Sequence, residues 1–181
     1  KREIVDVVIF KQSREIQSEF KSIISGIKNE AIFWGGNFYI SVNEHKSLLL
    51  EKLKNGIKIK YLIFNPSSAL CENASKDFDE KNSNHFYDQC ITTIKNLMDL
   101  ESEWKKQKLS SYHAGGNLEI KLYSAIPRLR AYIIDPNEDN AFSYFIHFLY
   151  KIDSSDLSAY KIMNSKAGIV KSYANSFYKL W

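Results

Sequence analysis

The sequence predicts an α/β fold in which a mixed, mostly parallel sheet carries helices on both faces. Strand-like and helix-like segments alternate three times up to Lys106, and this alternation is typical of parallel strands joined by right-handed crossovers. Three further strand-like segments follow with short links, which favours antiparallel pairing. An amphipathic segment ends the chain. The predicted order of elements is therefore βαβαβα, then βββ, then α.

The first strand and helix are predicted in the opening part of the chain. Residues 3–10 (EIVDVVIF) are rich in β-branched and aromatic residues, as strands are. The segment behind them carries one apolar stripe at helical spacing. The stripe consists of Ile16, Phe20, Ile23, Ile24 and Ile27. We therefore expect a strand followed by an amphipathic helix.

A second strand is predicted over residues 31–34 (AIFW), directly before a Gly-Gly-Asn sequence. The next helix is expected to begin at residues 41–44 (SVNE), whose S-x-x-E pattern predicts a capping box. Asn55-Gly56 is expected to end this helix, because glycine adopts a left-handed backbone conformation without steric cost.

A third strand is predicted over residues 57–64 (IKIKYLIF), and Asn65-Pro66 is expected to end it. Residues 67–82 are polar and predict irregular structure. A long helix is predicted from about residue 84 to residue 106, because its apolar residues lie along one side.

The last part of the chain predicts three strands and a helix. Residues 117–123 alternate between apolar and polar, residues 128–134 form a second segment, and residues 141–150 form a third, aromatic one. Their short links predict an antiparallel edge of the sheet. Residues 166–181 then predict a closing helix with one apolar face.

Length and charge limit the function classes. The 181 residues predict a single domain, residues 1–181, with enough apolar residues (44%) for a core. The net charge of +4 permits contact with phosphates. The chain lacks the dense Lys/Arg clusters of a dedicated nucleic-acid binder. A phosphate-bearing ligand or a nucleic acid is thus an open partner class.

Compartment signals favour a reduced, cytoplasmic protein. No apolar run approaches the roughly 18 residues of a membrane span, and no signal peptide opens the chain. Cys71 and Cys90 lack C-x-x-C spacing and the four histidines are scattered, so we expect no metal and no cofactor. One disulfide is the less favoured alternative. Because Lys1 is not a methionine, we expect a fragment of a longer protein with fused domains.

Two stretches resemble the phospholipase D-like fold. They are LLLEKLKNGIKIKYLIFNP, residues 48–66, and LEIKLYSAIPRLRAYIIDP, residues 118–136. In that family the second strand of such a pair carries H-x-K-x-x-x-x-D. The histidine attacks a phosphodiester, the lysine holds the phosphate and the aspartate supports the site. The resemblance extends over residues 12–181 and implies the same fold.

The motif is degenerate in this chain. The window ending at Asp135 places Arg128 at the histidine position and Arg130 at the lysine position. Arginine stays protonated, so it cannot replace the nucleophile, but it binds phosphate well. The resemblance therefore implies a domain of the non-catalytic kind found in bacterial multidomain proteins, and it also implies a homodimer paired across the cleft.

The strand with the degenerate motif holds the first candidate site residues. Arg128, Arg130 and Tyr132 alternate along one strand, so their side chains share a face. They could converge on a phosphate pocket, or the arginines could simply protect a solvated edge strand. Asp135 either bonds the backbone of its turn or orients one of the arginines.

His147 is the low-ranked catalytic alternative. A single histidine on an aromatic strand is more often a core or edge residue than a general base. A divergent phosphodiesterase or nuclease would nevertheless use it. No Ser-His-Asp or Cys-His arrangement is recognisable in the sequence.

Gly35, Gly36 and Asn37 lie between a strand and a helix, where an anion can bind a helix N-terminus. The alternative is a tight strand exit that requires close backbone approach. Tyr39 and Asn65 are expected nearby, because ligands favour the carboxyl ends of neighbouring parallel strands. All five residues are therefore predicted to line a cleft.

The sequence thus favours a non-catalytic domain that binds or senses a phosphate-bearing ligand, a nucleotide or a nucleic acid. The enzyme described above is one alternative. A homodimerisation or protein-interaction domain, using residues 142–150 and the helix ending at Trp181, is the other.

Overall fold

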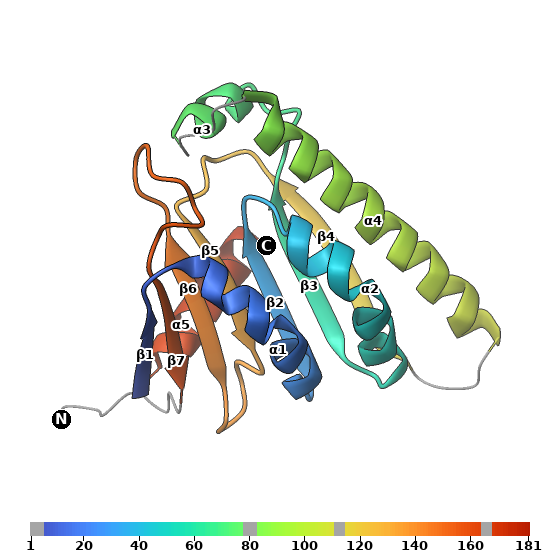
Figure 1. Cartoon of the computed structure of the whole chain (residues 1–181). Helices are drawn as coiled ribbons and strands as arrows, with labels where there is room; N and C mark the ends of the chain where they lie inside the picture. Colours follow the sequence, from blue (N-terminus) through green and yellow to red (C-terminus); the bar gives the residue numbers. More distant parts are fainter. Residues whose placement is uncertain (1–5, 78–82, 111–114, 164–167) are drawn as a thin grey trace.

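The computed structural model of the chain describes residues 6–77, 83–110, 115–163 and 168–181. Its strands form one sheet in the order β1-β7-β6-β5-β2-β3-β4 (Figure 1). The strands are β1 (Asp6–Phe10), β2 (Glu30–Gly35), β3 (Lys58–Phe64), β4 (Asn117–Tyr123), β5 (Leu129–Ile134), β6 (Phe142–His147) and β7 (Ala159–Met163). The helices are η1 (Ser13–Glu19, of 3₁₀ type), α1 (Phe20–Gly26), α2 (Tyr39–Lys54), α3 (Cys71–Asp77), α4 (Ser83–Ser110) and α5 (Ile169–Leu180).

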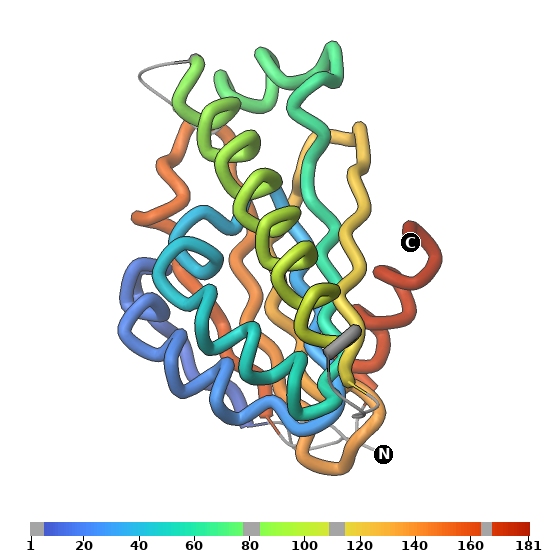
Figure 2. The backbone as a smooth tube through the Cα atoms, turned by 90° about the vertical axis from the view of Figure 1, so that its right-hand side faces the viewer, coloured from blue at the N-terminus to red at the C-terminus, as the bar shows by residue number. Residues whose placement is uncertain are grey.

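The sheet lies between helices, as the sequence predicts. α1, α2 and α4 cover one face, and α5 lies on the opposite face (Figures 1 and 2). Alternate residues of each strand point to opposite faces. In β2, Ala31 and Phe33 are buried with residues of α1, α2 and α4, whereas Ile32 is buried with residues of α5. The predicted α/β architecture with both faces covered is confirmed.

An aromatic cluster forms the floor beneath the carboxyl end of β2. Phe33 stacks on Tyr61 with ring centroids 4.4 Å apart and meets Tyr132 edge-on at 5.8 Å. Phe38 packs edge-on against the same three rings. Such offset and edge-to-face pairs stabilise the core beyond simple area burial. The residues above this floor are therefore held on a rigid base.

The expectation of a mostly parallel sheet is wrong. β2–β3 and β3–β4 are parallel, and the other four pairings among the described strands are antiparallel. The first strand causes part of the error, because β1 lies at the far edge of the sheet against β7 and not beside β2. The alternation of strand and helix there does not build a parallel unit.

The predicted antiparallel edge also differs from the structure. β4 pairs in parallel with β3, at one edge of the sheet, despite its short link to β5. The antiparallel set is β5, β6, β7 and β1. The sequence pattern predicts no strand at β7. Most of its residues are only half-buried, and the clear apolar alternation of a strand is missing there.

Two local predictions also change. Residues 71–77 form α3 inside the segment predicted to be irregular, because Cys71 and Ala74 pack with Phe64 and Phe86 in a small apolar cluster. Helix α2 begins at Tyr39, so Ser41 is inside it and not at its cap. The Ser41 hydroxyl donates to the Phe38 carbonyl at 3.0 Å.

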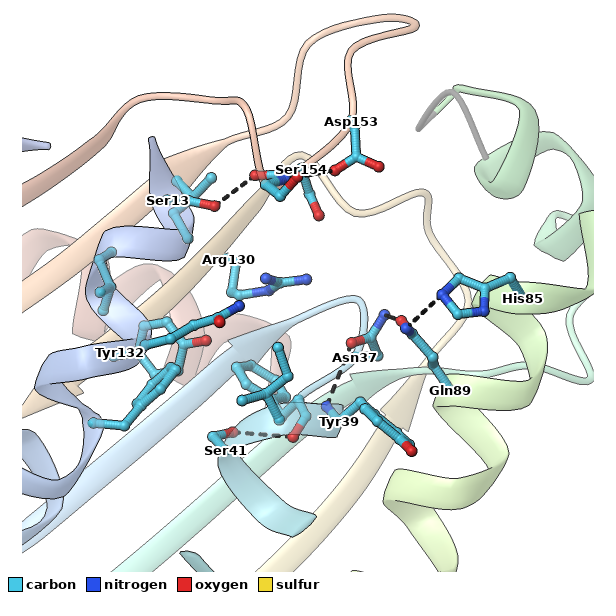
Figure 3. Close-up of a pocket in the computed structure, with 17 residues that line it drawn as sticks. Ser13, Asn37, Tyr39, Ser41, His85, Gln89, Arg130, Tyr132, Asp153 and Ser154 are labelled. Carbon is cyan, nitrogen blue, oxygen red and sulfur yellow. Dashed lines mark hydrogen bonds between the residues drawn. The ribbon is translucent and has the colours of Figure 1, made fainter. Parts of the chain in front are cut away.

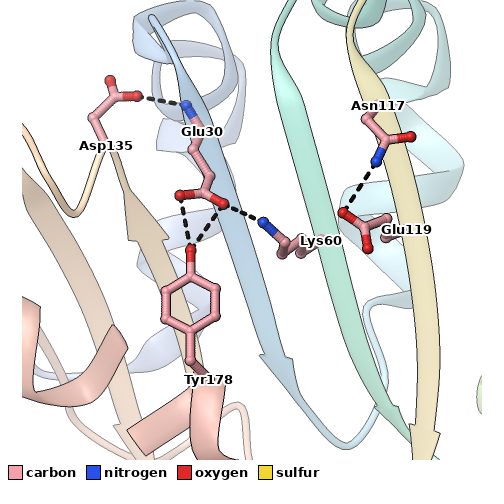
Figure 4. Close-up of polar contacts among 6 residues, drawn as sticks. All are labelled: Glu30, Lys60, Asn117, Glu119, Asp135 and Tyr178. Carbon is pink, nitrogen blue, oxygen red and sulfur yellow. Dashed lines mark hydrogen bonds and ion pairs between the residues drawn. The ribbon is translucent and has the colours of Figure 1, made fainter. Parts of the chain in front are cut away.

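A tyrosine of α5 contacts a buried ion pair between two strands and so attaches the helix to the sheet (Figure 4). Lys60 Nζ on β3 lies 2.5 Å from Glu30 Oε1 on β2, and both side chains are largely buried. The Tyr178 hydroxyl of α5 donates to the same carboxylate at 2.9 Å. Burial, with the carboxylate of Glu30 next in effect, raises the pKa of Tyr178. The phenol therefore stays a donor, and α5 is held in register.

Candidate functional site

A cavity of roughly 190 Å³ opens at the carboxyl end of β2. Its walls come from η1, the start of α2, the start of α4, β5 and the loop after β6 (Figure 3). The polar side chains that matter chemically are Asn37, Tyr39, His85, Gln89, Arg130, Tyr132 and Asp153. They converge from segments that are far apart in the sequence.

Arg130 supplies the positive charge of the cavity. Its guanidinium projects into the space framed by Asn37, His85 and Asp153 (Figure 3). The guanidinium carbon lies 5.6 Å from the centre of the Phe148 ring, within the range of a cation–π contact. Its Nε atom is buried and has no hydrogen-bond partner among the residues that the structure describes. A buried donor of this kind is costly unless a ligand or water satisfies it.

Gly35 allows Arg130 to take this position. A Cβ atom at Gly35 would lie 3.1 Å from the Arg130 Cα atom and 3.3 Å from its Cβ and Cγ atoms. At Gly36, an added Cβ would meet the Phe86 ring at 3.0 Å. Both glycines allow close approach of neighbouring segments, which is one of the two interpretations of the sequence.

Tyr132 lies beneath Arg130 and is almost fully buried. Its ring packs edge-on against Phe20, with centroids 5.0 Å apart. Burial raises the pKa of Tyr132 to about 12, and the neighbouring Arg130, which hydrogen-bonds the phenol, works against that rise. The phenol is therefore neutral at physiological pH and serves as a fixed base for the arginine.

The raised pKa of Tyr132 predicts a loss of stability in alkali. Up to pH 10 the phenol is protonated in both the folded and the unfolded chain, so its contribution is fully present. From pH 10 to 12 the unfolded chain loses the proton first, and the free energy of unfolding falls. The rise in pKa from 10.0 to about 12 corresponds to roughly 2–3 kcal/mol.

Urea unfolding at pH 9 to 12 measures this loss in the wild type and in Tyr132→Phe. We expect the variant to lose roughly 2–3 kcal/mol less over the interval. The other buried tyrosines are common to both proteins, so their titration cancels except for the smaller effect of Tyr132 on the pKa of Tyr61. Parallel stability curves for the two proteins would contradict the assignment.

A chain of hydrogen bonds orients the opposite wall. The Tyr39 backbone N–H donates to Asn37 Oδ1 at 3.4 Å, so Asn37 Nδ2 faces Gln89 and donates to its Oε1 at 3.0 Å. Gln89 Nε2 then lies 2.7 Å from His85 Nε2. Because the amide nitrogen can only donate, His85 Nε2 accepts and a neutral imidazole carries its proton on Nδ1. These bonds hold the side chains of Asn37, Gln89 and His85 in one arrangement on this wall.

Asp153 supplies the negative charge at the rim. Its Oδ1 accepts hydrogen bonds from the Ser155 backbone N–H at 2.7 Å and from the Ser155 hydroxyl at 2.6 Å. Partial burial raises the pKa of Asp153, but the hydrogen bonds from Ser155 and the positive charge of Arg130 outweigh it, and the net shift is downward. The carboxylate of Asp153 is therefore ionised at neutral pH.

The structure brings four of the predicted site residues together. Arg130, Tyr132, Asn37 and Tyr39 all line the cavity. Gly35 and Gly36 lie directly behind it and provide the close packing described above. Their grouping agrees with the prediction that the exit of β2 faces the strand with the degenerate motif.

Two predicted residues lie elsewhere. Arg128 precedes β5, is exposed, and lines two shallower hollows next to Ile126. Asn65 stabilises a turn, since its Oδ1 accepts from the Ser67 backbone N–H at 3.0 Å. The arginines are separated because β5 begins only at Leu129, so the strand alternation does not extend to Arg128.

Asp135 lies at the other end of the sheet. β5 runs antiparallel to β2, so its last residue reaches the start of β2 and not the cavity. The buried carboxylate accepts hydrogen bonds from the backbone N–H groups of Lys28, Asn29 and Glu30 at 2.8–3.0 Å. It therefore orients neither arginine. It joins two chain segments, whereas a local turn bond was expected.

His147 faces away from the cavity. It follows Phe145 on the face of β6 that packs against α5, and its Nε2 lies 3.4 Å from the Tyr173 hydroxyl. Ile146, its neighbour in sequence, faces the cavity. The structure therefore places His147 on the opposite face of the sheet from Arg130, and the two cannot act on one ligand.

Three site residues were missed by the sequence interpretation. His85 and Gln89 are four residues apart on α4, a spacing that puts them on one face of a helix. That spacing was the available signal, but nothing in it indicates a cavity. Asp153 lies in the loop after β6, and no sequence pattern marks it. Only the fold brings these residues to Arg130.

The described part of the chain shows neither a metal site nor a membrane-spanning helix. No group of three or more His, Cys, Asp or Glu side chains there could hold a metal ion. None of the described helices is long and apolar enough to cross a membrane. Cys71 and Cys90 are buried and do not form a disulfide with each other.

Comparison with known proteins gives structural matches. The chain resembles a phospholipase D family member, Nuc from Salmonella typhimurium, with a TM-score of 0.56, 10% identity, and coverage of 97% of this chain and 93% of Nuc. NucT from Helicobacter pylori matches with a TM-score of 0.52, 14% identity, and coverage of 97% and 94%. The chain has a phospholipase D-like fold. At these identities the similarity shows the fold alone.

A third match comes from a larger protein. TrmBL2, an archaeal chromatin protein that binds DNA, matches with a TM-score of 0.57 and 12% identity over 100% of this chain. The chain spans about half of the TrmBL2 chain, 54%. No protein-family model and no curated protein matches the sequence.

Proposed function

We propose that this phospholipase D-like domain binds a phosphate-bearing ligand through Arg130 without cleaving it. The observation that carries the proposal is the Arg130 guanidinium, which projects into the cavity while its buried Nε atom finds no partner in the described part of the chain. A phosphate oxygen satisfies such a donor and neutralises the charge, and the planar fork of arginine suits phosphate better than lysine does.

The same geometry argues against covalent catalysis. Arginine stands at both basic positions of the degenerate motif, and neither can attack a phosphodiester. His147 lies on the opposite face of the sheet. His85 reaches the cavity, but its Nε2 lone pair accepts the hydrogen bond from Gln89. A nucleophile would need that lone pair free. The domain therefore binds or senses its ligand.

The structural neighbours are compatible with a phosphate ligand. One is a phospholipase D family member and another is a chromatin protein that binds DNA. A nucleotide or a nucleic acid accordingly belongs to the proposed ligand class. The sensor role, the homodimer, the fused domains and the cytoplasmic setting of a bacterial protein stay predictions.

Isothermal titration tests the proposal with inorganic phosphate, 5′-AMP and short oligonucleotides. We expect Arg130→Ala to weaken phosphate or nucleotide binding by roughly 10- to 100-fold, the effect of losing a charged hydrogen bond. Arg128→Ala is the matched control, because it removes the same charge two residues away outside the cavity. It should change the dissociation constant by less than about twofold, as exposed charges contribute little.

Two results would contradict the proposal. One is equal binding of every probe by the wild type and Arg130→Ala. The other is an equal loss in both arginine variants, which would indicate a diffuse charge effect and not a site. Hydrolysis of a phosphodiester by the wild type would separately overturn the non-catalytic assignment.

A further inference from the structure

Hydrogen bonds to two neighbouring segments hold the loop that carries Asp153 at the rim of the cavity. The Ser13 hydroxyl donates to the Ser154 carbonyl at 2.6 Å, and the Ser13 backbone N–H donates to the Leu157 carbonyl at 2.7 Å. On the other side, the Lys151 backbone N–H donates to the Asp77 carbonyl at 2.7 Å. The loop is thus anchored to η1 and to α3, and Asp153 is held at the rim of the cavity that Arg130 also lines.

One oxygen of this carboxylate is available to a ligand. Oδ1 is occupied by the two hydrogen bonds from Ser155. Among the described residues, none donates a hydrogen bond to Oδ2. An ionised carboxylate only accepts, so it requires a donor such as a hydroxyl or an amine from the ligand. A ligand that complements the cavity therefore carries two different groups, an anion for Arg130 and a hydrogen-bond donor for Asp153.

The charge of the cavity disfavours a nucleic-acid strand. Arg130 is the single Lys or Arg among the described residues that line it, and Asp153 offsets its charge. Grooves that bind a strand carry several basic side chains along the phosphate backbone. An ionised carboxylate at the rim of the cavity would repel the further phosphates of such a polymer.

The size of the cavity points to a compact ligand. Its volume of roughly 190 Å³ is below the roughly 300 Å³ at which pockets for drug-sized ligands begin. A phosphate with one sugar ring is of the appropriate scale, and a base would extend past the exposed Tyr39 at the mouth. A carboxylate that accepts hydrogen bonds from sugar hydroxyls is a recurring way of recognising ribose.

We propose that the ligand is a sugar phosphate with vicinal hydroxyls, free or as a mononucleotide, held with its phosphate on Arg130 and its hydroxyls on Asp153. The proposal rests on the phosphate-binding function above and specifies its ligand class. The amide side chains of Asn37 and Gln89 line the wall of the cavity opposite Arg130 (Figure 3). Ribose 5-phosphate is the simplest compound with this chemistry.

The test compares ribose 5-phosphate with 2-deoxyribose 5-phosphate by isothermal titration. The wild type should bind the ribose compound about tenfold more tightly, as expected for a hydrogen bond to a charged group. Asp153→Asn should reduce that ratio to near one, with affinity for inorganic phosphate unchanged or higher. Asp156→Asn is the matched control, since this exposed acid of the same loop does not line the cavity, and it should keep the ratio.

The possible results distinguish a failure of the proposed ligand class from a failure of the phosphate site, and they distinguish a free sugar phosphate from a mononucleotide. Equal affinity of the wild type for both sugar phosphates, with binding that still depends on Arg130, would overturn the ligand class and leave the phosphate site intact. An oligodeoxynucleotide that binds more tightly than ribose 5-phosphate would also overturn it, in favour of a strand. Tighter binding of 5′-AMP than of ribose 5-phosphate supports a mononucleotide, and the reverse supports a free sugar phosphate.

Discussion

Gly116→Ala is expected to lower the free energy of unfolding by about 4 kcal/mol, which belongs to the most severe class of point mutations. An added Cβ atom would lie 1.9 Å from the Ile57 carbonyl oxygen and 2.8 Å from the Ile57 carbonyl carbon. Both are backbone atoms, so no side chain can rotate away. The contact can be relieved only by moving β4 away from the start of β3.

That movement would break specific hydrogen bonds. The Gly116 backbone N–H donates to the Leu53 carbonyl at 2.6 Å, and the Asn117 N–H donates to the Ile57 carbonyl at 3.2 Å. The first bond joins the segment before β4 to the end of α2, and the second begins the parallel pairing of β4 with β3. Urea unfolding followed by circular dichroism should show a lower midpoint, or an unfolded chain if the stability of the wild type is small.

Gly26→Ala is the matched control for this substitution. Gly26 is the exposed last residue of α1, and an added Cβ atom there has nothing within 4 Å. Alanine should be neutral or stabilising by up to about 1 kcal/mol, because it restricts the unfolded chain and favours a helix. Similar losses in the two variants would show that the contact at Gly116 does not decide the stability.

Asp135→Ala is expected to cost about 3 kcal/mol of unfolding free energy, because a buried acceptor of three backbone N–H groups disappears. Each buried donor left without a partner costs roughly 1–3 kcal/mol, and water that enters the turn recovers part of this. The backbone of Asp135 also lies in the left-handed region, at φ 48°. Aspartate tolerates this conformation better than alanine does.

Thermal and urea unfolding of Asp135→Ala measure this cost. Asp139→Ala, an exposed acid in the same turn, should stay within about 0.5 kcal/mol of the wild type, as most surface substitutions do. Phosphate binding by the folded fraction of Asp135→Ala should be unchanged, since the residue is at the opposite end of β2 from the cavity. A large loss of affinity with full stability would contradict the structural role.

The strands and helices with strong local patterns could be predicted from the sequence. The stripe from Ile16 to Ile27 forms the buried side of η1 and α1, and Gly56, with φ 87°, ends α2 as expected. The run from Ile57 to Phe64 is a central strand buried on both faces. These segments are decided by residues close in sequence, so periodicity and turn chemistry suffice.

Part of the candidate site could also be predicted, because some of its residues lie in segments with strong local patterns. The spacing of the degenerate motif indicated Arg130 and Tyr132, because alternate residues of a strand share a face. The exit of β2 indicated Asn37 and Tyr39. His85, Gln89 and Asp153 could not be placed, because a helix and a loop distant in sequence contribute them. Arg128 was misplaced because β5 begins only after it. Asp135 was misplaced because it follows the end of β5 that is remote from the cavity.

The sequence by itself determined where most strands and helices lie, that helices cover both faces, and which strand carries the arginine. The tertiary structure decided the order and direction of the strands, since pairing depends on contacts between distant segments that periodicity does not encode. It thereby decided that β4 joins β3, that β1 and β7 form the other edge, and that Asp153 and Arg130 line the same cavity. The charge of the cavity, and with it the proposed ligand, follows from that last juxtaposition.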